Sequence, residues 1–447
     1  MGSLIRFLED RVEREIEARK SRGVRVVDPR AQTSSSLLMD VPENDSRRGV
    51  PPLGLREYWY PLVPDSKVRG KKPLYWNILG DDVVLFRDKK GQVAALSDTC
   101  AHRGTSLSEG DCFYEGFVSC PYHGATFAGD GECVAFICEG PDSKMVGNLH
   151  MKVYPTKTIR DWVFIWMGDG EPAPIEEDVP PELFEPETQM HASYTYWTTN
   201  WLMAIENHSD SHNAFYVHRN SVSQLTSNHA GRDRSPVAPT GRIINNRSIV
   251  TVHPGHGYYD VDGKSPYQMY YPGVDGVWPL HTYRKMWIWF FDIFNARKRA
   301  GFTGVFKKAP EEWALGHHLP CAVRAGGGST RWAIPVEPNL SRIVYFYFTR
   351  PKTALGRFWD RVMFKFWRFP MAYNFSGQDN TAATPVRFFT PEHFAPTDSQ
   401  LIMLRKLITD GSRDAVRRRQ PHDNGGGNGA SAPSDTAPTR EPVGSAS

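Results

Sequence analysis

Two cysteine–histidine pairs constrain this chain more than any other feature of its sequence. The first pair is Cys100 and His102, the second is Cys120 and His123, and seventeen residues separate the two pairs. Two thiolates and two imidazoles suit a [2Fe–2S] cluster in which the cysteines hold one iron and the histidines hold the other. A Cys2His2 set also binds zinc, but zinc fingers group Cys with Cys and His with His. The mixed pairs therefore favour an iron–sulfur cluster, with structural zinc as the alternative.

The surroundings of the two pairs predict a β-rich domain. A glycine follows each pair, Gly104 and Gly124, as expected for two ligand loops that clamp a cluster from both sides. Between Tyr58 and about Asp169, short apolar runs alternate with Gly and Asp turns, a pattern typical of short strands. Six cysteines in 447 residues do not make a disulfide framework. The four cysteines outside the pairs are interpreted as packing residues: Cys112, Cys133, Cys138 and Cys321.

Composition divides the rest of the chain into four parts. We expect an N-terminal helix and arm over residues 1–54, the β-rich cluster domain over 55–170, a second domain over 171–410 and a disordered tail over 411–447. The second domain has helical periodicity over residues 195–222, then strand-like runs, then helical segments after residue 355. The basic, aromatic segment 357–368 is expected to pack on the second domain as a helix, with a membrane-surface helix as the alternative.

Charge and hydrophobicity exclude several classes of partner. The net charge is only +3, which does not imply binding to nucleic acid. No run of about 18 uncharged apolar residues predicts a transmembrane helix. The N-terminal sequence MGSLIRFLEDRVEREIEARK has no apolar signal-peptide core, so we expect a cytoplasmic protein. No Gly-rich flavin or nicotinamide fingerprint occurs, so a redox reaction would require a separate electron donor.

The cluster motif resembles that of the Rieske non-haem iron oxygenases, specifically the α-subunits of aromatic ring-hydroxylating oxygenases. These proteins carry Cys-x-His-Arg-Gly followed by Cys-Pro-Tyr-His-Gly, as this chain does. Respiratory Rieske proteins usually add a disulfide cysteine to each ligand motif, where this chain has Thr105 and Tyr122. The resemblance spans roughly residues 55–410. It implies an α+β fold: a β-rich Rieske domain, then a catalytic domain with helices on an antiparallel sheet (helix-grip or START-like). It also implies one [2Fe–2S] cluster, one mononuclear Fe(II) and O2 as co-substrate.

For the mononuclear iron, the resemblance leaves the first histidine ligand open. The family carries Glu-Asn, an Asp three residues after that Asn, and then two histidines. Asn207 and Asp210 are in place, but the expected slot of the first histidine holds Asn213 and a histidine precedes it at His212. His212 and His218 are one possible ligand pair. Alternatively, Asn213 replaces the first histidine, or the pair is His208 and His212, which are four residues apart on a helix.

The third ligand is expected from a distant part of the chain. Gln378-Asp379 resembles the family's late Gln-Asp element, so Asp379 would complete a facial triad of two histidines and one carboxylate, which leaves positions open on the iron. A helix N-cap is the alternative for this Asp. By position, Asp210 would accept hydrogen bonds from a cluster histidine and an iron-ligand histidine across a subunit interface. The alternative for Asp210 is an aspartate that is simply solvated on a helix. Asn207 belongs to the same family motif as Asp210.

The implied protein is the terminal component of a Rieske-type oxygenase. The family forms homotrimers (α3), sometimes with β-subunits, and takes electrons from NAD(P)H through a reductase and in some cases a ferredoxin. A docking surface is expected near Arg103 and Lys89–Lys90. The substrate would be a small apolar compound, aromatic or polycyclic, and hydroxylation or oxidative demethylation both stay open. The alternative from another class is a non-catalytic Rieske electron-transfer or binding subunit with a degenerate second iron site, which the irregular Asn213 motivates.

Overall fold

The structure is a computed structural model that describes ten parts of the chain: residues 45–209, 217–218, 235–236, 240–252, 256–257, 310–325, 329–369, 375–386, 388 and 392–419. Three of the residues named above, Asp210, His212 and Asn213, lie outside the described residues, as do the N-terminal segment 1–44 and the residues after 419.

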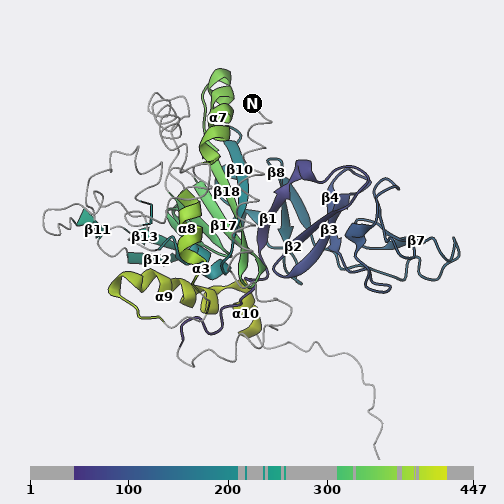
Figure 1. Ribbon diagram of the computed structural model, residues 1–447, viewed down its shortest axis with the longest axis horizontal. Helices are drawn as coiled ribbons and strands as arrows, with labels where there is room; N and C mark the ends of the chain where they lie inside the picture. The colour runs from purple at the N-terminus through teal and green to yellow at the C-terminus, as the bar shows by residue number, and fades with distance from the viewer. Residues whose placement is uncertain are drawn as a thin grey trace, which may run out of the picture.

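Three small antiparallel sheets build the first domain (Figure 1). The strands are β1 (Trp59–Pro64), β2 (Leu74–Ile78), β3 (Asp81–Arg87), β4 (Val93–Ser97), β5 (Val118–Ser119), β6 (Ala125–Phe127), β7 (Cys133–Phe136), β8 (Thr156–Ile159) and β9 (Trp162–Trp166). They pair in the orders β1-β9-β8, β2-β3-β4 and β5-β6-β7. The predicted β-rich domain is confirmed, because the short apolar runs are strands separated by tight turns.

One seven-stranded sheet dominates the second domain. Its order is β10-β18-β17-β16-β15-β13-β12 and every pairing is antiparallel. The strands are β10 (Gln189–Trp197), β12 (Thr240–Ile244), β13 (Ser248–Val252), β15 (Gly316–His318), β16 (Ala322–Ala325), β17 (Ser329–Glu337) and β18 (Leu340–Thr349), and β11 (Ser235–Pro236) pairs separately with β14 (His256–Gly257). The antiparallel sheet confirms the expected α+β class.

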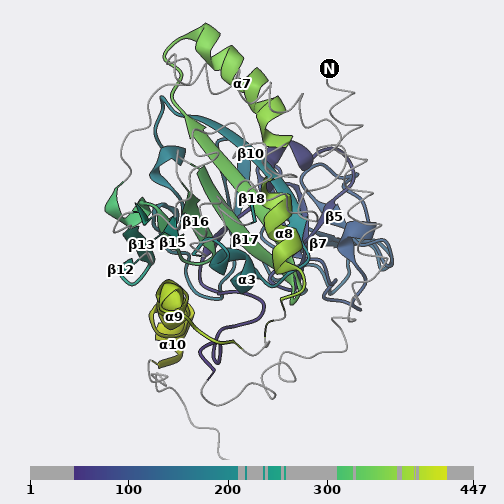
Figure 2. The same cartoon turned by 60° about the vertical axis from the view of Figure 1, so that its left-hand side comes forward.

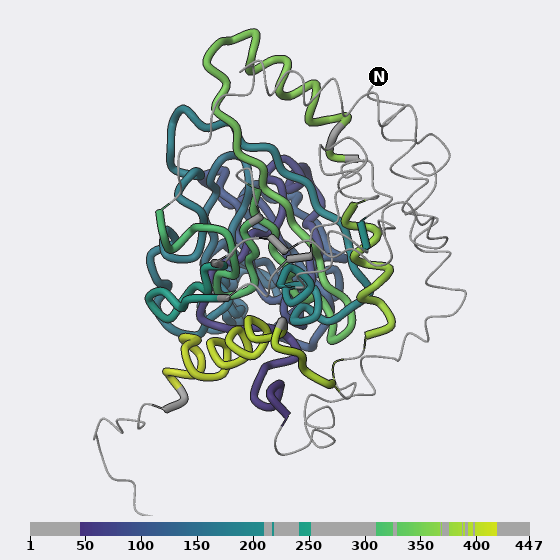
Figure 3. Tube along the Cα trace, turned by 90° about the vertical axis from the view of Figure 1, so that its left-hand side faces the viewer, coloured from purple at the N-terminus to yellow at the C-terminus, as the bar shows by residue number. Residues whose placement is uncertain are grey.

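The described helices are few and lie against this sheet. They are α3 (Trp201–Glu206), α7 (Ala354–Phe369), α8 (Ser376–Ala383), α9 (Ser399–Lys406) and α10 (Arg413–Arg419). Helix α8 lies over β17 and β18 (Figure 2), and α9 and α10 run along one edge of the sheet (Figure 3). None of the described helices is both long and apolar enough to cross a membrane.

The two faces of the large sheet have different neighbours. On one face, Phe346 packs edge-on against Trp162 of β9 at 5.2 Å between ring centroids, and Arg342 lies 4.1 Å from the ring of Trp76 in β2. These contacts join the two domains into one apolar core. The opposite face carries Arg331, whose guanidinium approaches Asp379 of α8. Side chains alternate along a strand, so this second face is the one that meets α8.

Two sequence predictions were wrong at their boundaries. Helical periodicity predicts a helix from residue 195, but residues 195–197 belong to β10 and α3 begins at Trp201, because the aromatic and β-branched side chains there pair well with β18. The disordered tail is predicted from residue 411, yet α10 forms over Arg413–Arg419. Arg413 anchors it through ion pairs with Glu177 (2.7 Å) and Asp178 (2.8 Å).

The amphipathic segment 357–368 lies within α7, and its inner face packs on the sheet. Asp360 accepts a hydrogen bond from Nε2 of His191 at 2.6 Å, and the ring of Phe364 stacks on the same histidine at 4.5 Å. Leu355 and Phe358 are exposed on the outer side. The expectation of a helix packed on the second domain is therefore met on the inner face.

Candidate metal centres

The first candidate centre lies between two matching loops of the first domain. The amide of Gly104 donates to the carbonyl of Cys100 at 2.8 Å, and the amide of Gly124 donates to the carbonyl of Cys120 at 3.1 Å. Both glycines have positive φ, 78° and 68°. A Cβ on Gly124 would also lie 2.7 Å from Cβ of Ile137, so only glycine fits this turn. The two turns hold the cysteine–histidine pairs in equivalent conformations.

The four predicted cluster ligands are brought together. The rings of His102 and His123 are 4.7 Å apart between centroids, and both Cys100 and Cys120 are buried. Burial raises the pKa of Cys100 to about 11, and the neighbouring Cys120 thiol contributes to the rise. Among the described residues, Nδ1 of His123 is buried and has no hydrogen-bond partner. Two close thiols and a buried imidazole nitrogen without a hydrogen-bond partner fit a [2Fe–2S] cluster.

The second candidate centre lies between α8 and His218. Nε2 of His218 is 3.0 Å from Oδ1 of Asp379, and both side chains are almost fully buried. Nδ1 of the same histidine is 3.2 Å from Oε1 of Gln378, and Phe375 stacks on the imidazole ring at 3.6 Å between centroids. Two of the three expected iron ligands therefore meet. Within the described ranges, no three His, Cys, Asp or Glu side chains are placed to hold a single metal ion, which is consistent with a cluster whose two irons take two protein ligands each. The expected third ligand of the mononuclear iron, His212, lies outside these ranges.

The sequence reasoning quoted Gln378 as part of a motif without giving it a role, and it did not single out Arg331. A metal-binding histidine usually donates its other ring N–H to an acceptor, and Gln378 is placed to accept from His218. Nη1 of Arg331 in β17 lies 3.8 Å from Oδ2 of Asp379, while its Nη2 donates to the carbonyl of Ala204 at 2.9 Å. The sequence contains one signal for Arg331: it is a charged residue inside the apolar run Thr330–Val336, and a buried charge needs a partner.

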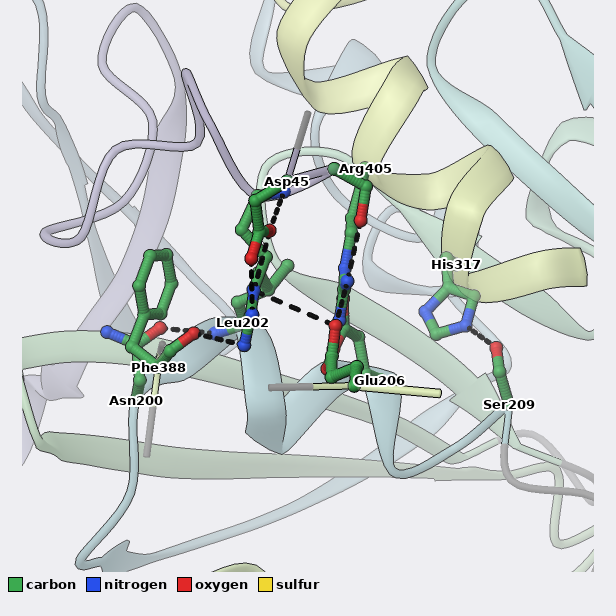
Figure 4. A network of polar contacts seen from close by, with 11 residues as sticks. Asp45, Asn200, Leu202, Glu206, Ser209, His317, Phe388 and Arg405 are labelled. Atoms are coloured by element: carbon green, nitrogen blue, oxygen red, sulfur yellow. Dashed lines mark hydrogen bonds and ion pairs between the residues drawn. The ribbon is translucent and has the colours of Figure 1, made fainter. Parts of the chain in front are cut away.

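Helix α3 leads into the segment that carries the expected first histidine. Its last residue, Glu206, forms a bidentate pair with Arg405 of α9 at 2.6 and 2.8 Å (Figure 4). Arg405 also binds both carboxylate oxygens of Glu392, at 2.6 and 2.9 Å. Burial raises the pKa of Glu206 to about 7, while the Arg405 guanidinium opposes that rise. The end of α3 is thus fixed by a buried ion-pair network.

The residues after α3 are partly described. The amide of Asn207 donates to the carbonyl of Met203 at 3.1 Å, which places Asn207 on the last turn of the helix. The ring of His208 lies edge-on to that of His317 in β15 at 5.7 Å. Ser209 bonds Nε2 of His317 (Figure 4). His208 thus lies beside a sheet histidine.

Large apolar side chains are exposed around the cluster loops. Tyr122, next to His123, is 56% exposed and its ring lies 3.8 Å from the histidine ring. Ile137 is 52% exposed, and Arg103 lies 5.8 Å from the Tyr122 ring. These loops form the end of the first domain that is remote from the large sheet, beside β7 in Figure 1. The exposed apolar side chains suit a surface that another protein covers.

Comparison with known proteins identifies two adjoining segments. Residues 58–155 match the Rieske [2Fe-2S] domain, and residues 166–239 match the homotrimeric ring hydroxylase family. The terminal oxygenase component of carbazole 1,9a-dioxygenase from a Sphingomonas species is 33% identical over 171 residues, which cover 38% of this chain and 45% of that protein. The oxygenase subunit of 3-chlorobenzoate-3,4-dioxygenase from Comamonas testosteroni is 29% identical over 198 residues, covering 43% of this chain and 45% of that subunit. The matched region thus spans about half the length of these relatives.

Solved structures share the fold over most of the chain. The terminal oxygenase of carbazole 1,9a-dioxygenase from Nocardioides aromaticivorans IC177 superposes with a TM-score of 0.65 at 22% identity, over 83% of this chain and all of that one. A fluorene-bound complex of a carbazole 1,9a-dioxygenase oxygenase with its ferredoxin gives 0.62 at 20% identity, over 84% of this chain and 98% of that one. The predicted order of a β-rich domain followed by a sheet domain with few helices is therefore the fold of these oxygenases.

Proposed function

We propose that this chain belongs to the Rieske-type ring-hydroxylating oxygenases, as a Rieske domain followed by a ring-hydroxylase α-subunit domain, and that it is the terminal component of such an oxygenase. It would take electrons from a separate reductase or ferredoxin and insert oxygen from O2 into an apolar, aromatic or polycyclic substrate. The family implies one [2Fe–2S] cluster and one mononuclear iron, which supply single-electron transfer and O2 activation when bound.

The pairing of His218 with Asp379 is the observation that carries this proposal. The two residues are far apart in sequence, yet Nε2 and Oδ1 are 3.0 Å apart in a buried site. In the proposed site, His212, His218 and Asp379 hold the iron, and Gln378 fixes the His218 ring by accepting from Nδ1. A subunit that only carries electrons has no need of this constellation, so the pairing argues against the electron-carrier alternative.

At the cluster, Cys100 and Cys120 would hold one iron, and His102 and His123 the other. The close histidine rings, the buried thiols and the free Nδ1 of His123 support this assignment. We propose the domain limits 1–54, 55–170 and 171–410, with residues 411–419, which include α10, joined to the second domain and the tail starting after them.

We propose that the protein works as a homotrimer in which the cluster of one subunit faces the iron of its neighbour. The location of the cluster loops at the far end of the first domain and the exposed Tyr122 and Ile137 support an interface there. Asp210, with Asn207 beside it, would bridge the two histidines across this interface. Reductase or ferredoxin would dock near Arg103 and Lys89–Lys90, whose side chains are exposed. A cytoplasmic location is proposed from the six free cysteines, which suit a reducing compartment.

Iron analysis with EPR tests the proposal. We expect about three irons per chain, a Rieske signal from the reduced cluster and a separate nitrosyl signal from the mononuclear iron. His218→Ala should keep the Rieske signal and lose the nitrosyl signal, whereas the control His393→Ala, at an exposed histidine, should keep both. A nitrosyl signal that survives in His218→Ala would contradict the assignment. About two irons, with no nitrosyl signal after Fe(II) is added, would favour the electron carrier.

The ligand in the first histidine slot needs its own comparison. His212→Ala and Asn213→Ala replace the two competing residues one at a time. Loss of mononuclear iron only in His212→Ala would support His212 as the ligand, and loss only in Asn213→Ala would support the substituted site.

A further inference from the structure

We propose that the outer face of α7 binds the surface of an anionic phospholipid membrane, which would make this a peripheral membrane protein. The inner face of the helix packs on the large sheet, and the outer face divides into a basic stripe and an apolar stripe. The inference goes beyond the proposed function, because binding to lipid requires neither of the two metal centres.

The protein itself occupies the inner face of α7. Asp360, Met363 and Phe364 are buried there. The Asp360 carboxylate accepts hydrogen bonds from His191 and from the hydroxyl of Thr349, and Phe364 stacks on the same histidine. Asp360 is the only acidic residue of α7, so the outer side of the helix carries no negative side chain.

Basic side chains form a stripe along one outer side of α7. Arg357, Arg361 and Lys365 are exposed and follow one another at intervals of four residues, which places them on one line along the helix. Lys352, just before the helix, is exposed as well. Within the described part of the chain, none of these four side chains forms an ion pair. Like charges four residues apart destabilise a helix, so a negatively charged partner would stabilise this one.

Large apolar side chains form a second stripe beside the basic one. Leu355 is 59% exposed and Phe358 is 57% exposed. The half-buried Val362 continues their line, because residues three and seven positions apart lie on the same side of a helix. Two large apolar side chains exposed to this extent on adjacent turns favour a surface that something apolar covers.

The position of α7 leaves this outer face accessible to an extended surface. Among the described elements, α7 stands at the end of the molecule opposite α9 and α10 (Figure 1 and Figure 3). The N-terminal turns of the helix, which carry Leu355 and Phe358, form the outermost part of that end. The cluster loops beside β7 lie at a different end (Figure 1), so a partner on α7 would leave them uncovered.

The two stripes together favour lipid over an acidic protein. Basic side chains beside exposed Phe and Leu on one helix are typical of helices that lie at the boundary between lipid headgroups and acyl chains. Anionic headgroups supply the charge opposite Arg357, Arg361 and Lys365, and the acyl chains take up Leu355 and Phe358. A folded acidic protein would supply the charge but would also need a groove shaped for the two apolar side chains.

Vesicle flotation of the full, cluster-loaded protein tests the inference. Vesicles of phosphatidylcholine alone are compared with vesicles that contain about 30 mol% phosphatidylserine. We expect binding to the anionic vesicles to be at least about tenfold stronger, and to weaken between about 0.05 M and about 0.5 M salt because salt screens the charges. Equal binding to the two kinds of vesicle, or binding to neither, would overturn the inference.

A charge variant and its matched control locate the contact. Arg357→Gln combined with Arg361→Gln should weaken binding to the anionic vesicles about 30-fold, or about fivefold for each charge removed. The control combines Arg69→Gln with Lys72→Gln and removes two exposed charges from the first domain. It should keep the binding to within about twofold, since these residues lie far from α7 in the sequence and in the other domain.

An apolar variant tests the second stripe. Leu355→Asn combined with Phe358→Asn should weaken binding by about tenfold or more, because it removes the apolar contact. All variants should keep the Rieske signal and the urea midpoint, since the replaced side chains are exposed. Binding that survives in both α7 variants would place the lipid contact elsewhere in the chain and overturn the inference. A smaller molecular mass of these variants in solution, with unchanged vesicle binding, would also overturn it and make α7 an interface between copies of this chain.

Discussion

Replacing Arg405 by Met should destabilise the protein strongly, because it leaves the buried carboxylate of Glu206 without the cation that it is hydrogen-bonded to. The side chain of Arg405 is 1% exposed and that of Glu206 is 6% exposed. Four hydrogen bonds of 2.6–2.9 Å join Arg405 to Glu206 and Glu392. Removal of one partner from a buried ion pair typically costs about 3–5 kcal/mol. We expect a loss of that size in the free energy of unfolding at pH 8.5.

The loss should depend on pH in a direction that follows from Glu206. Burial already raises the pKa of this carboxyl to about 7, above its unfolded value near 4.5. Without Arg405 the opposing contribution is gone and the pKa rises further. A carboxyl with a raised pKa stabilises the fold when it is protonated, and the stabilisation is lost as pH rises through the folded pKa. Arg405→Met should therefore be less destabilising at pH 5.5 than at pH 8.5.

Urea unfolding at the two pH values measures the effect, with Glu206→Gln and the double variant completing the cycle. The double variant has no unpaired buried charge at position 206, so it should be more stable than Arg405→Met alone. Because Glu206 ends α3 just before Asn207, the single variant should also lose mononuclear iron while it keeps the cluster signal. The explanation by an unpaired Glu206 carboxylate would be refuted if the double variant were as unstable as Arg405→Met. It would also be refuted if Arg405→Met lost the same free energy of unfolding at both pH values.

Three further outcomes follow from the same structure. Gln378→Leu removes the acceptor for His218 and should weaken Fe(II) binding by about 10–100-fold, with an unchanged Rieske signal; unchanged affinity in an Fe(II) titration would contradict this. Gly124→Ala should lower the urea midpoint for cluster loss more than Gly140→Ala does, because both glycines have positive φ but only the first Cβ would collide with a neighbour; equal midpoints would exclude the collision. Burial lowers the pKa of His318 to about 3, so below about pH 6.5 the unfolded chain binds a proton that the folded chain does not. The free energy of unfolding should therefore fall towards lower pH, by up to about 1.4 kcal/mol per pH unit. If His318→Asn shows the same pH dependence of its unfolding midpoint, groups other than His318 cause that dependence.

The sequence by itself predicted the proposed cluster ligands and the order of a β-rich domain followed by a sheet domain. Each cysteine–histidine pair lies within four residues and is followed by a turn glycine, so its local conformation depends on neighbouring residues alone. The strand-like runs predicted for the second domain are likewise strands, among them Thr330–Val336 within β17 and the run after Arg342 within β18, because an apolar run is a local property of the chain.

Only the tertiary structure decided which distant residues meet. Gln378 accepts from His218 and Arg331 faces Asp379. The sequence indicates that an arginine in an apolar run needs a partner, but it does not indicate which distant residue that partner is. The same is true of Ser193, Tyr345, Arg331 and His317, which come from four strands and share one face of the sheet only through the pairing register. The physical reason is that the burial of whole apolar faces sets the strand register and the packing of helices. That arrangement decides which partners a polar residue meets, and one polar residue has little influence on it.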